Sequence, residues 1–490
     1  MDMYAALFAR RNGGGGSGTT VIANPEGEAT DTLEKIGIGD TIYTINDDVF
    51  FYANKSLFPA SGEEGKLYID EAYNAIYRWD GNDYVTLTKN PIVYGMHIDG
   101  SESDPDSMIT YLEDAVGMTP AYMDYTNDAF NYGSWGDVWF VKECKPCILK
   151  QDGSVQCYLN PNNYAEDVDG NAVTIDENLA GANVMVEFPK IWLKVVPDTD
   201  AKSGSVYISN VQVDSDYHDF PYIDHRGRHQ EHFYMAAYNS STISNVLRSL
   251  SGQTTTKTKS LAGGMEISYA EANGVGWSTE HAGQVMLINF LLLLMGKSTN
   301  TQAVFGEGLH TSGTEAINND FPTGIHNAKG LFYGTNSGAA ATYTNAVKVF
   351  GIENWWGFQW RRYRGDILDN GTLKIKLCYG TEDGSTTSSF NIDGTGYVTV
   401  SGGTPSGTSG SYISEMVFAD NGMYAKVANS NAASSGSKYC DGYWFDGSGV
   451  RFALRGGASY NGAPAGAFCV SRNIDVRYAN WNIGARLSYI

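Results

Sequence analysis

The last residues of the chain alternate strictly between apolar and polar positions. Ile483, Ala485, Leu487 and Tyr489 are separated by a glycine, an arginine and a serine. Side chains of a β-strand point to opposite faces in turn, so this period predicts a strand that closes the chain. Apolar runs bounded by turn residues predict further strands at 66–70, 75–79, 84–87, 137–150, 154–160, 183–196 and 373–380, and one within 449–459 that ends at a Gly-Gly break.

One segment has the pattern of a buried helix. Residues 279–295 are apolar nearly all round a helical projection, Ser278 or Thr279 can cap the start, and Gly296 can end it. Its apolar stretch at 285–295 is too short to cross a bilayer. A weaker helix is predicted at 260–272, and a flexible loop at 402–412. The sequence therefore predicts an α+β fold that is β-rich.

The N-terminal part divides into short segments. The glycine-rich stretch at 13–18 is typical of a flexible linker, and it tethers an amphipathic peptide at 1–11. We interpret 1–30 as a flexible tether or docking peptide and 31–92 as a small β module. Such a module is too small to be firmly stable alone.

The charge is uneven along the chain. The net charge of −22 argues against general nucleic-acid binding, which needs a basic face. The last 40 residues nevertheless carry five arginines against one acid, Asp475, and so have a charge of +4. These arginines are either scattered solubilising charge or part of a distinct contact surface.

Residues 218–232 contain a histidine cluster. His225, His229 and His232 fall at i, i+4 and i+7, which on a helix would present a metal-binding face. Pro221 and Gly227 argue against a regular helix, so we interpret the segment as a polar loop, with metal binding as the alternative.

The cysteines and tryptophans are interpreted as structural residues, with no role in a metal or ligand site. Cys144, Cys147 and Cys157 lack the partners of a zinc site, which favours buried or half-exposed free thiols. The tryptophans at 355, 356 and 360 favour core packing, with sugar stacking as the alternative.

Catalytic motifs are not recognisable in the chain. It lacks a G-x-S-x-G elbow, and its plentiful carboxylates leave a glycosidase pair open without singling one out. We therefore predict a protein that is not an enzyme, with no cofactor, no resident metal and no membrane insertion.

Residues 458–482 have the composition of a recognition surface. Tyrosine, tryptophan and arginine supply contact area, and asparagine and serine supply adaptable hydrogen bonds. Strands on both sides would hold these side chains on a rigid frame, which lowers the entropic cost of binding. The predicted contact residues are Ser459, Tyr460, Asn461, Pro464, Ser471, Arg472, Asn473, Asp475, Arg477, Tyr478, Asn480 and Trp481. The alternative is a polar surface loop.

The segment at 450–490, "VRFALRGGASYNGAPAGAFCVSRNIDVRYANWNIGARLSYI", resembles the variable region of proteins diversified by diversity-generating retroelements. Its LRGG strand and its NWNIGARL ending carry the likeness. Residues 184–195, 274–308 and 351–362 resemble the ligand-binding body of such proteins in phages of gut bacteria. Residues 62–87 resemble a small module of phage tail proteins.

The resemblance implies a C-type-lectin-like fold, used without calcium, whose variable side chains form the receptor-binding face. Serine, tyrosine, asparagine and aspartate at the predicted contact positions fit the residues that adenine mutagenesis yields, whereas Arg472 and Arg477 fit less cleanly. We accordingly expect a β-rich lead-in at 93–215 and a lectin-like domain at 216–490, with its variable region at about 451–490.

The expected function is that of a receptor-binding protein in the virion tail, made in the host cytoplasm. Its partners would be a protein or glycan receptor on the bacterial surface and other tail proteins through residues 1–92, in a homotrimer that does not bind nucleic acid. A depolymerase or a structural tail protein is the alternative. A formylglycine-generating oxidase shares the implied fold, but Cys440 and Cys469 are spaced poorly for its copper site.

Overall fold

The computed structural model describes residues 35–38, 41–44, 48–53, 55–70, 75–82, 84–87, 91–254, 263–309, 322–336, 345–378 and 394–490. The predicted docking peptide and glycine linker lie outside these residues. The chain divides into two compact units. One comprises the described residues of Met1–Ile92 with Ser209–His218, and the other comprises those of Val93–Ile208 with Asp219–Ile490.

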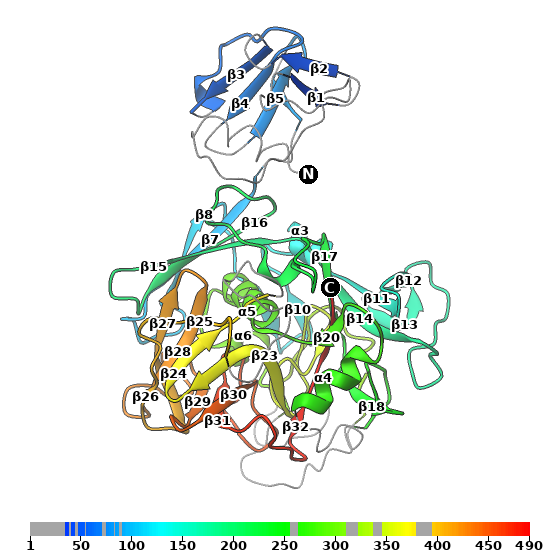
Figure 1. Ribbon diagram of the computed structural model, residues 1–490, viewed down its shortest axis with the longest axis vertical. Coiled ribbons are helices and arrows are strands. Elements are labelled where there is room, and N and C mark those ends of the chain that lie inside the picture. The colour runs from blue at the N-terminus through cyan, green and yellow to red at the C-terminus, as the bar shows by residue number, and fades with distance from the viewer. Residues whose placement is uncertain are drawn as a thin grey trace. The chain divides into compact units, whose positions relative to one another are not determined.

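The described chain is β-rich with few helices, as the sequence predicts (Figure 1). Its helical segments are η1 (Lys55–Leu57), α3 (Trp139–Lys142), η2 (Phe220–Tyr222), α4 (Gly263–Glu271), α5 (Ala282–Gly296) and α6 (Thr301–Phe305). The predicted helices at 260–272 and 279–295 correspond to α4 and α5 and are confirmed. None of the helices in the described ranges is long and apolar enough to cross a lipid bilayer.

The N-terminal unit contains the three strands predicted between 66 and 87. Its strands are β1 (Lys35–Ile38), β2 (Thr41–Thr44), β3 (Val49–Tyr52), β4 (Leu67–Asp70), β5 (Ala75–Trp79) and β6 (Tyr84–Thr86). The first two form a hairpin, and the others form a sheet in the order β3-β4-β5-β6. Aromatic rings pack over it, with Tyr84 4.8 Å from Tyr68 and 4.9 Å from Phe58 between ring centroids.

The second unit opens with a four-stranded sheet, and its described residues also form three separate two-stranded sheets. The sheet has the order β15-β16-β7-β8. Its strands are β7 (Val93–Ile98), β8 (Ile109–Glu113), β15 (Trp192–Pro197) and β16 (Gly204–Ser209). The strands of the two-stranded sheets are β9 (Tyr122–Asp124) with β10 (Ala129–Asn131), β18 (Ser241–Ile243) with β19 (Val246–Arg248), and β21 (Lys348–Val349) with β22 (Ile352–Glu353).

A seven-stranded sheet joins the lead-in to the C-terminus. Its order is β13-β12-β11-β14-β17-β33-β20. The strands are β11 (Lys145–Lys150), β12 (Val155–Asn160), β13 (Asn163–Asp167), β14 (Ala182–Pro189), β17 (His232–Ala236), β20 (Trp277–Thr279) and β33 (Leu487–Tyr489). Because β14 pairs with β17 and β17 with β33, the boundary expected between 215 and 216 does not separate two compact units.

The second large sheet carries the C-terminal loops. Its path is β25-β24-β23-β30-β31-β29-β27-β28-β26, with β32 paired to β23 in parallel. The strands are β23 (Trp360–Asp369), β24 (Thr372–Ile375), β25 (Val398–Thr399), β26 (Ser406–Gly407), β27 (Ser411–Ala419), β28 (Gly422–Ala428), β29 (Gly442–Phe445), β30 (Val450–Arg455), β31 (Val470–Ile474) and β32 (Ile483–Gly484).

Helix α5 lies between strands of the two large sheets in Figure 1, and its side chains share one apolar core with both. Nearly every residue of α5 is buried, as the all-round apolar pattern predicts. The predicted cap is wrong: Ser278 and Thr279 belong to β20, and His281 caps the helix in a capping box with Gln284. Burial lowers the pKa of His281 to about 3, so this cap is a neutral ring.

Two local predictions also need correction. The strand predicted at 137–150 begins only at β11, because α3 occupies 139–142. A short apolar run fits both the helical and the strand period, so the sequence pattern alone does not distinguish the two. The loop predicted at 402–412 contains β26 and the start of β27. There Ser406 of β26 pairs with Val427 of β28, so part of the predicted loop is a strand of the sheet.

The closing strand is buried on both faces. Leu487 on one face and Arg486 and Ser488 on the other are at most 1% exposed. Strand β33 pairs with β17 on one side and β20 on the other, which places it inside the sheet. The polar half of the terminal alternation therefore points into the protein.

Candidate functional site

The C-terminal loops present a small polar and aromatic surface beside β23. We call it the terminal face and define it as Tyr460, Asp475, Arg477, Tyr478, Asn480 and Trp481. Asp475 and Arg477 are exposed, and Tyr478 is 47% exposed. The other three are half-buried. Of the remaining predicted contact residues, Asn461, Pro464 and Asn473 are half-buried, and the others are buried.

Hydrogen bonds within the loop fix its conformation. The Arg477 N–H donates to Asp475 Oδ1 over 2.7 Å, and the Tyr478 N–H donates to the Asp475 carbonyl over 3.0 Å. Asn480 uses its side chain twice: Nδ2 donates to Tyr478 Oη over 2.9 Å, and Oδ1 accepts from the Trp481 N–H over 2.8 Å. Such local bonds of aspartate and asparagine are typical of tight turns.

The two half-buried rings of the terminal face form a pair. Tyr460 and Trp481 lie 6.0 Å apart between ring centroids, at an interplanar angle of 58°. The Asn482 amide donates to the Tyr460 hydroxyl. Tyr460 also packs against a small apolar cluster that contains Trp360 and Ile483. Burial raises the pKa of Tyr460, so its phenol is neutral at physiological pH.

Strand β23 and the residue before it hold the loop through main-chain atoms. The Trp360 N–H donates to the Asn482 carbonyl over 2.9 Å, and Gln359 Nε2 donates to the Trp481 carbonyl over 3.0 Å. Arg362 Nη2 donates to the Tyr478 carbonyl over 2.6 Å. These three donors contact the backbone of the loop and leave the side chains of Tyr478 and Trp481 to point elsewhere.

Arg362, which donates to the Tyr478 carbonyl, also forms a buried ion pair. Arg362 Nη1 lies 2.7 Å from Glu266 Oε1 of α4, and the two side chains are 4% and 3% exposed. Burial raises the pKa of Glu266 to about 7, while Arg362 opposes the shift. The Arg362–Glu266 pair was not predicted, because 96 residues separate its members; the arginine-rich run at 361–364 was the only hint.

Three predicted contact residues are corrected by their burial. Ser459, Ser471 and Arg472 are 1%, 5% and 2% exposed, so their side chains are not displayed. Arg472 forms a bidentate ion pair with Asp366 of β23, at 2.6 and 2.7 Å. A guanidinium and a carboxylate that match as two forks satisfy each other inside a protein, and this pairing draws Arg472 inward.

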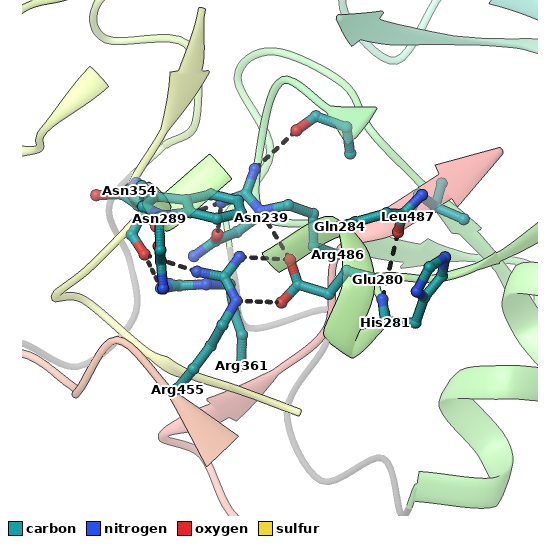
Figure 2. Close-up of polar contacts among 12 residues, drawn as sticks. Asn239, Glu280, His281, Gln284, Asn289, Asn354, Arg361, Arg455, Arg486 and Leu487 are labelled. Carbon is teal, nitrogen blue, oxygen red and sulfur yellow. Dashed lines mark hydrogen bonds and ion pairs between the residues drawn. The ribbon is translucent and has the colours of Figure 1, made fainter. Parts of the chain in front are cut away.

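The other C-terminal arginines are also mostly internal. Figure 2 shows Glu280 between Arg455 and Arg486, all three at most 2% exposed. Arg455 Nε donates to Glu280 Oε1 over 2.9 Å, and its guanidinium lies 3.6 Å from the centre of the Trp355 ring. With Arg472 also buried, the excess charge of the last 40 residues does not form a basic surface patch.

The LRGG segment acts as a structural corner. Strand β30 ends at Arg455, and Gly456 and Gly457 have φ values of +82° and +72°, so the predicted Gly-Gly break is confirmed. A Cβ on Gly456 would lie 2.1 Å from Arg361 Nη2, which leaves no room for a side chain. The core interpretation of the nearby tryptophans is also confirmed: Trp355, Trp356 and Trp360 are 0%, 0% and 5% exposed.

The histidine cluster does not converge on one point. Residues 220–222 form η2, and no α-helix follows up to β17. His229 Nδ1 lies 2.9 Å from Asp219, whereas His232 Nε2 lies 3.8 Å from Glu187. Over the part of the chain that the structure describes, no three histidine, cysteine, aspartate or glutamate side chains are grouped to hold a metal ion.

The cysteines are free, as the sequence predicts. Cys144 and Cys147 are buried, and Cys157 is half-buried. Cys440 and Cys469 are also buried free thiols. Burial raises the pKa of Cys440 to about 12, which keeps this thiol protonated at neutral pH.

No protein-family model and no curated protein matches the chain. Among solved structures, the chain is similar to the Major Tropism Determinant I1 and P3c variants, each with 11% identity, and to the M1 variant with 12%. Each comparison covers 90% of this chain and 98% of that chain, with a TM-score of 0.18. Similarity this slight does not carry a fold or a function over to this chain.

Proposed function

We propose that the chain is a phage tail receptor-binding protein that contacts the bacterial host surface through the terminal face. The observation that carries the proposal is a loop whose exposed Arg477 and Tyr478 stand on a backbone fixed by β23. Arginine and tyrosine are among the residue types enriched at the energetic hot spots of protein interfaces, and a fixed backbone lowers the entropy lost on binding.

The proposal extends to a C-type-lectin-like domain with a variable region at about 451–490. The sequence resemblance suggests both, and the main-chain anchors of the loop support the second. Arg362, Gln359 and the Trp360 N–H all donate to carbonyls, which every residue type possesses. Side chains at 477 and 478 can therefore change without loss of these anchors.

The assembly belongs to the same proposal. A homotrimer attached to other tail proteins through residues 1–92 would present three terminal faces together. Several weak contacts on one particle give an avidity far above the affinity of each. The proposal is one of binding without catalysis, and release of sugars from purified host capsule by the chain would favour a depolymerase instead.

The decisive experiment compares two tyrosines that are almost equally exposed and that each accept a hydrogen bond from an asparagine. Tyr478 is 47% exposed and accepts from Asn480, and Tyr122 is 46% exposed and accepts from Asn131 over 3.1 Å. We expect Tyr478→Ala together with Arg477→Ala to lower adsorption to host cells at least about tenfold, as for interface residues of these types. Tyr122→Ala should leave adsorption unchanged.

Thermal unfolding serves as the control for both variants. Their melting temperatures should stay close to that of the unaltered chain, because exposed substitutions change stability little. Tyr460 and Trp481 are left intact because Tyr460 packs on the apolar cluster. Unchanged adsorption by the double variant would contradict the proposed face.

A further inference from the structure

A concave site lies on the seven-stranded-sheet side of the second unit, in a part of the chain that the proposed function does not use. It is a pocket of about 540 Å³ lined by residues of α3, β11 and β12 and by the segment that follows β12. This volume falls within the range of about 300–1,000 Å³ that is typical of ligand sites. We call it the lysine-rimmed pocket.

The wall of the lysine-rimmed pocket is mainly apolar. Val141, Leu159 and Leu331 line it together with the rings of Tyr132 and Tyr158. Val141, Leu159 and Leu331 are at most 9% exposed, so they belong to the protein core and form a firm wall. Apolar walls of this kind bind hydrocarbon by removing its surface from water.

The charged residues among the described lining are both cations, Lys142 and Lys145. Lys142 Nζ lies 2.8 Å from Asp137, but the two side chains are 62% and 93% exposed, so water weakens this ion pair. Lys145 Nζ lies 5.2 Å from the centre of the Tyr158 ring, at the pocket itself. Both ammonium groups stand on flexible stems and can turn to an anion.

Val168 extends the apolar wall outward. It lines the pocket, it is 63% exposed, and its N–H donates to the Tyr158 carbonyl over 3.1 Å. The pocket therefore offers an apolar wall that begins at the surface, with two cations beside it, on a chain whose net charge is −22.

We propose that the lysine-rimmed pocket binds a medium-chain carboxylate amphiphile, with the alkyl chain against the apolar wall and the carboxylate at Lys142 and Lys145. A cationic head group would face both ammonium groups and would be repelled. A short carboxylate would gain the charge contact but little apolar burial. The ligand needs both parts, and the site is independent of the terminal face.

Isothermal titration calorimetry of the full chain tests this directly. Decanoate, decyltrimethylammonium and butanoate are compared at one ionic strength, below their micelle concentrations. We expect decanoate to bind at least about tenfold more tightly than either of the others. Equal affinity for the two ten-carbon ligands, or no heat of binding with decanoate, would overturn the proposal.

Two matched substitutions locate the site. Val168→Glu places an acid at the rim, whereas Val116→Glu places one at a valine that is 69% exposed and outside the pocket lining. We expect Val168→Glu to weaken decanoate binding about fivefold or more, with no change for Val116→Glu. The joint change of Lys142→Ala and Lys145→Ala should remove the preference for decanoate over decyltrimethylammonium. An equal loss in both valine variants, or a retained preference without the lysines, would refute the site.

Discussion

Arg472 and Arg477 are five positions apart and look alike in the sequence, but the structure gives them opposite roles. Arg472 is 2% exposed and forms a bidentate ion pair with Asp366, and its Nη1 donates to Tyr443 Oη over 3.1 Å. Arg477 is exposed. We expect Arg472→Ala to act on folding and Arg477→Ala to act on binding.

The loss of unfolding free energy expected for Arg472→Ala follows from the burial of its ion pair. Asp366 is 2% exposed, and without Arg472 its carboxylate keeps the Tyr363 hydroxyl, at 2.6 Å, as a close donor. Breaking one side of a buried ion pair costs about 3–5 kcal/mol of unfolding free energy. Exposed substitutions such as Arg477→Ala stay within about 0.5 kcal/mol.

Urea unfolding, followed by tryptophan fluorescence, measures both variants on the same scale. A double-mutant cycle adds Asp366→Ala: once the acid is absent, removal of Arg472 should cost less, with a coupling of about 0.5–3 kcal/mol. A stable Arg472→Ala protein that no longer adsorbs to host cells would refute the reasoning, because it would make Arg472 a contact residue.

Two further predictions concern buried carboxyl groups. Burial raises the pKa of Glu266 to about 7 from an ordinary value of 4.5, so the folded chain holds a proton that the unfolded chain releases. Unfolding free energy should fall as pH rises from about 4.5 to 7, by up to about 3 kcal/mol, and Glu266→Gln should remove this slope in denaturant titrations at each pH. Burial likewise raises the pKa of Asp441 to about 8, although the Phe468 N–H donates to it over 2.6 Å. Asp441→Asn keeps that acceptor, and it should flatten the loss of stability between about pH 4 and 8 by the same measurement.

Local elements could be predicted from the sequence, but their assembly could not. The apolar patterns of α5, β4 and β5 depend only on residues close together in the sequence, and these elements form where expected. The position of β33 between β17 and β20 depends on residues more than 200 positions away. The residues next to β33 in the sequence do not show that this strand is covered on both faces.

The candidate site could likewise be predicted only in part from the sequence. Asp475, Arg477 and Tyr478 are exposed, in agreement with a composition suited to contact. Arg472 belongs to the same segment, but its side chain is buried because it pairs with Asp366, 106 residues earlier. Composition shows which side chains are able to bind a partner, whereas burial depends on whether the fold brings an internal partner to them.

The anchors of the loop also predict which of its positions tolerate change. The Arg477 N–H and the Tyr478 carbonyl anchor positions 477 and 478 through main-chain atoms, and the side chain of Tyr478 adds one bond, as acceptor from Asn480 Nδ2. At 475 and 480 the side-chain oxygens of Asp475 and Asn480 accept from the backbone and thereby shape the turn. A surface that keeps its frame while its side chains vary therefore needs oxygen-bearing short residues at 475 and 480, and it is free to exchange residues of any size at 477 and 478.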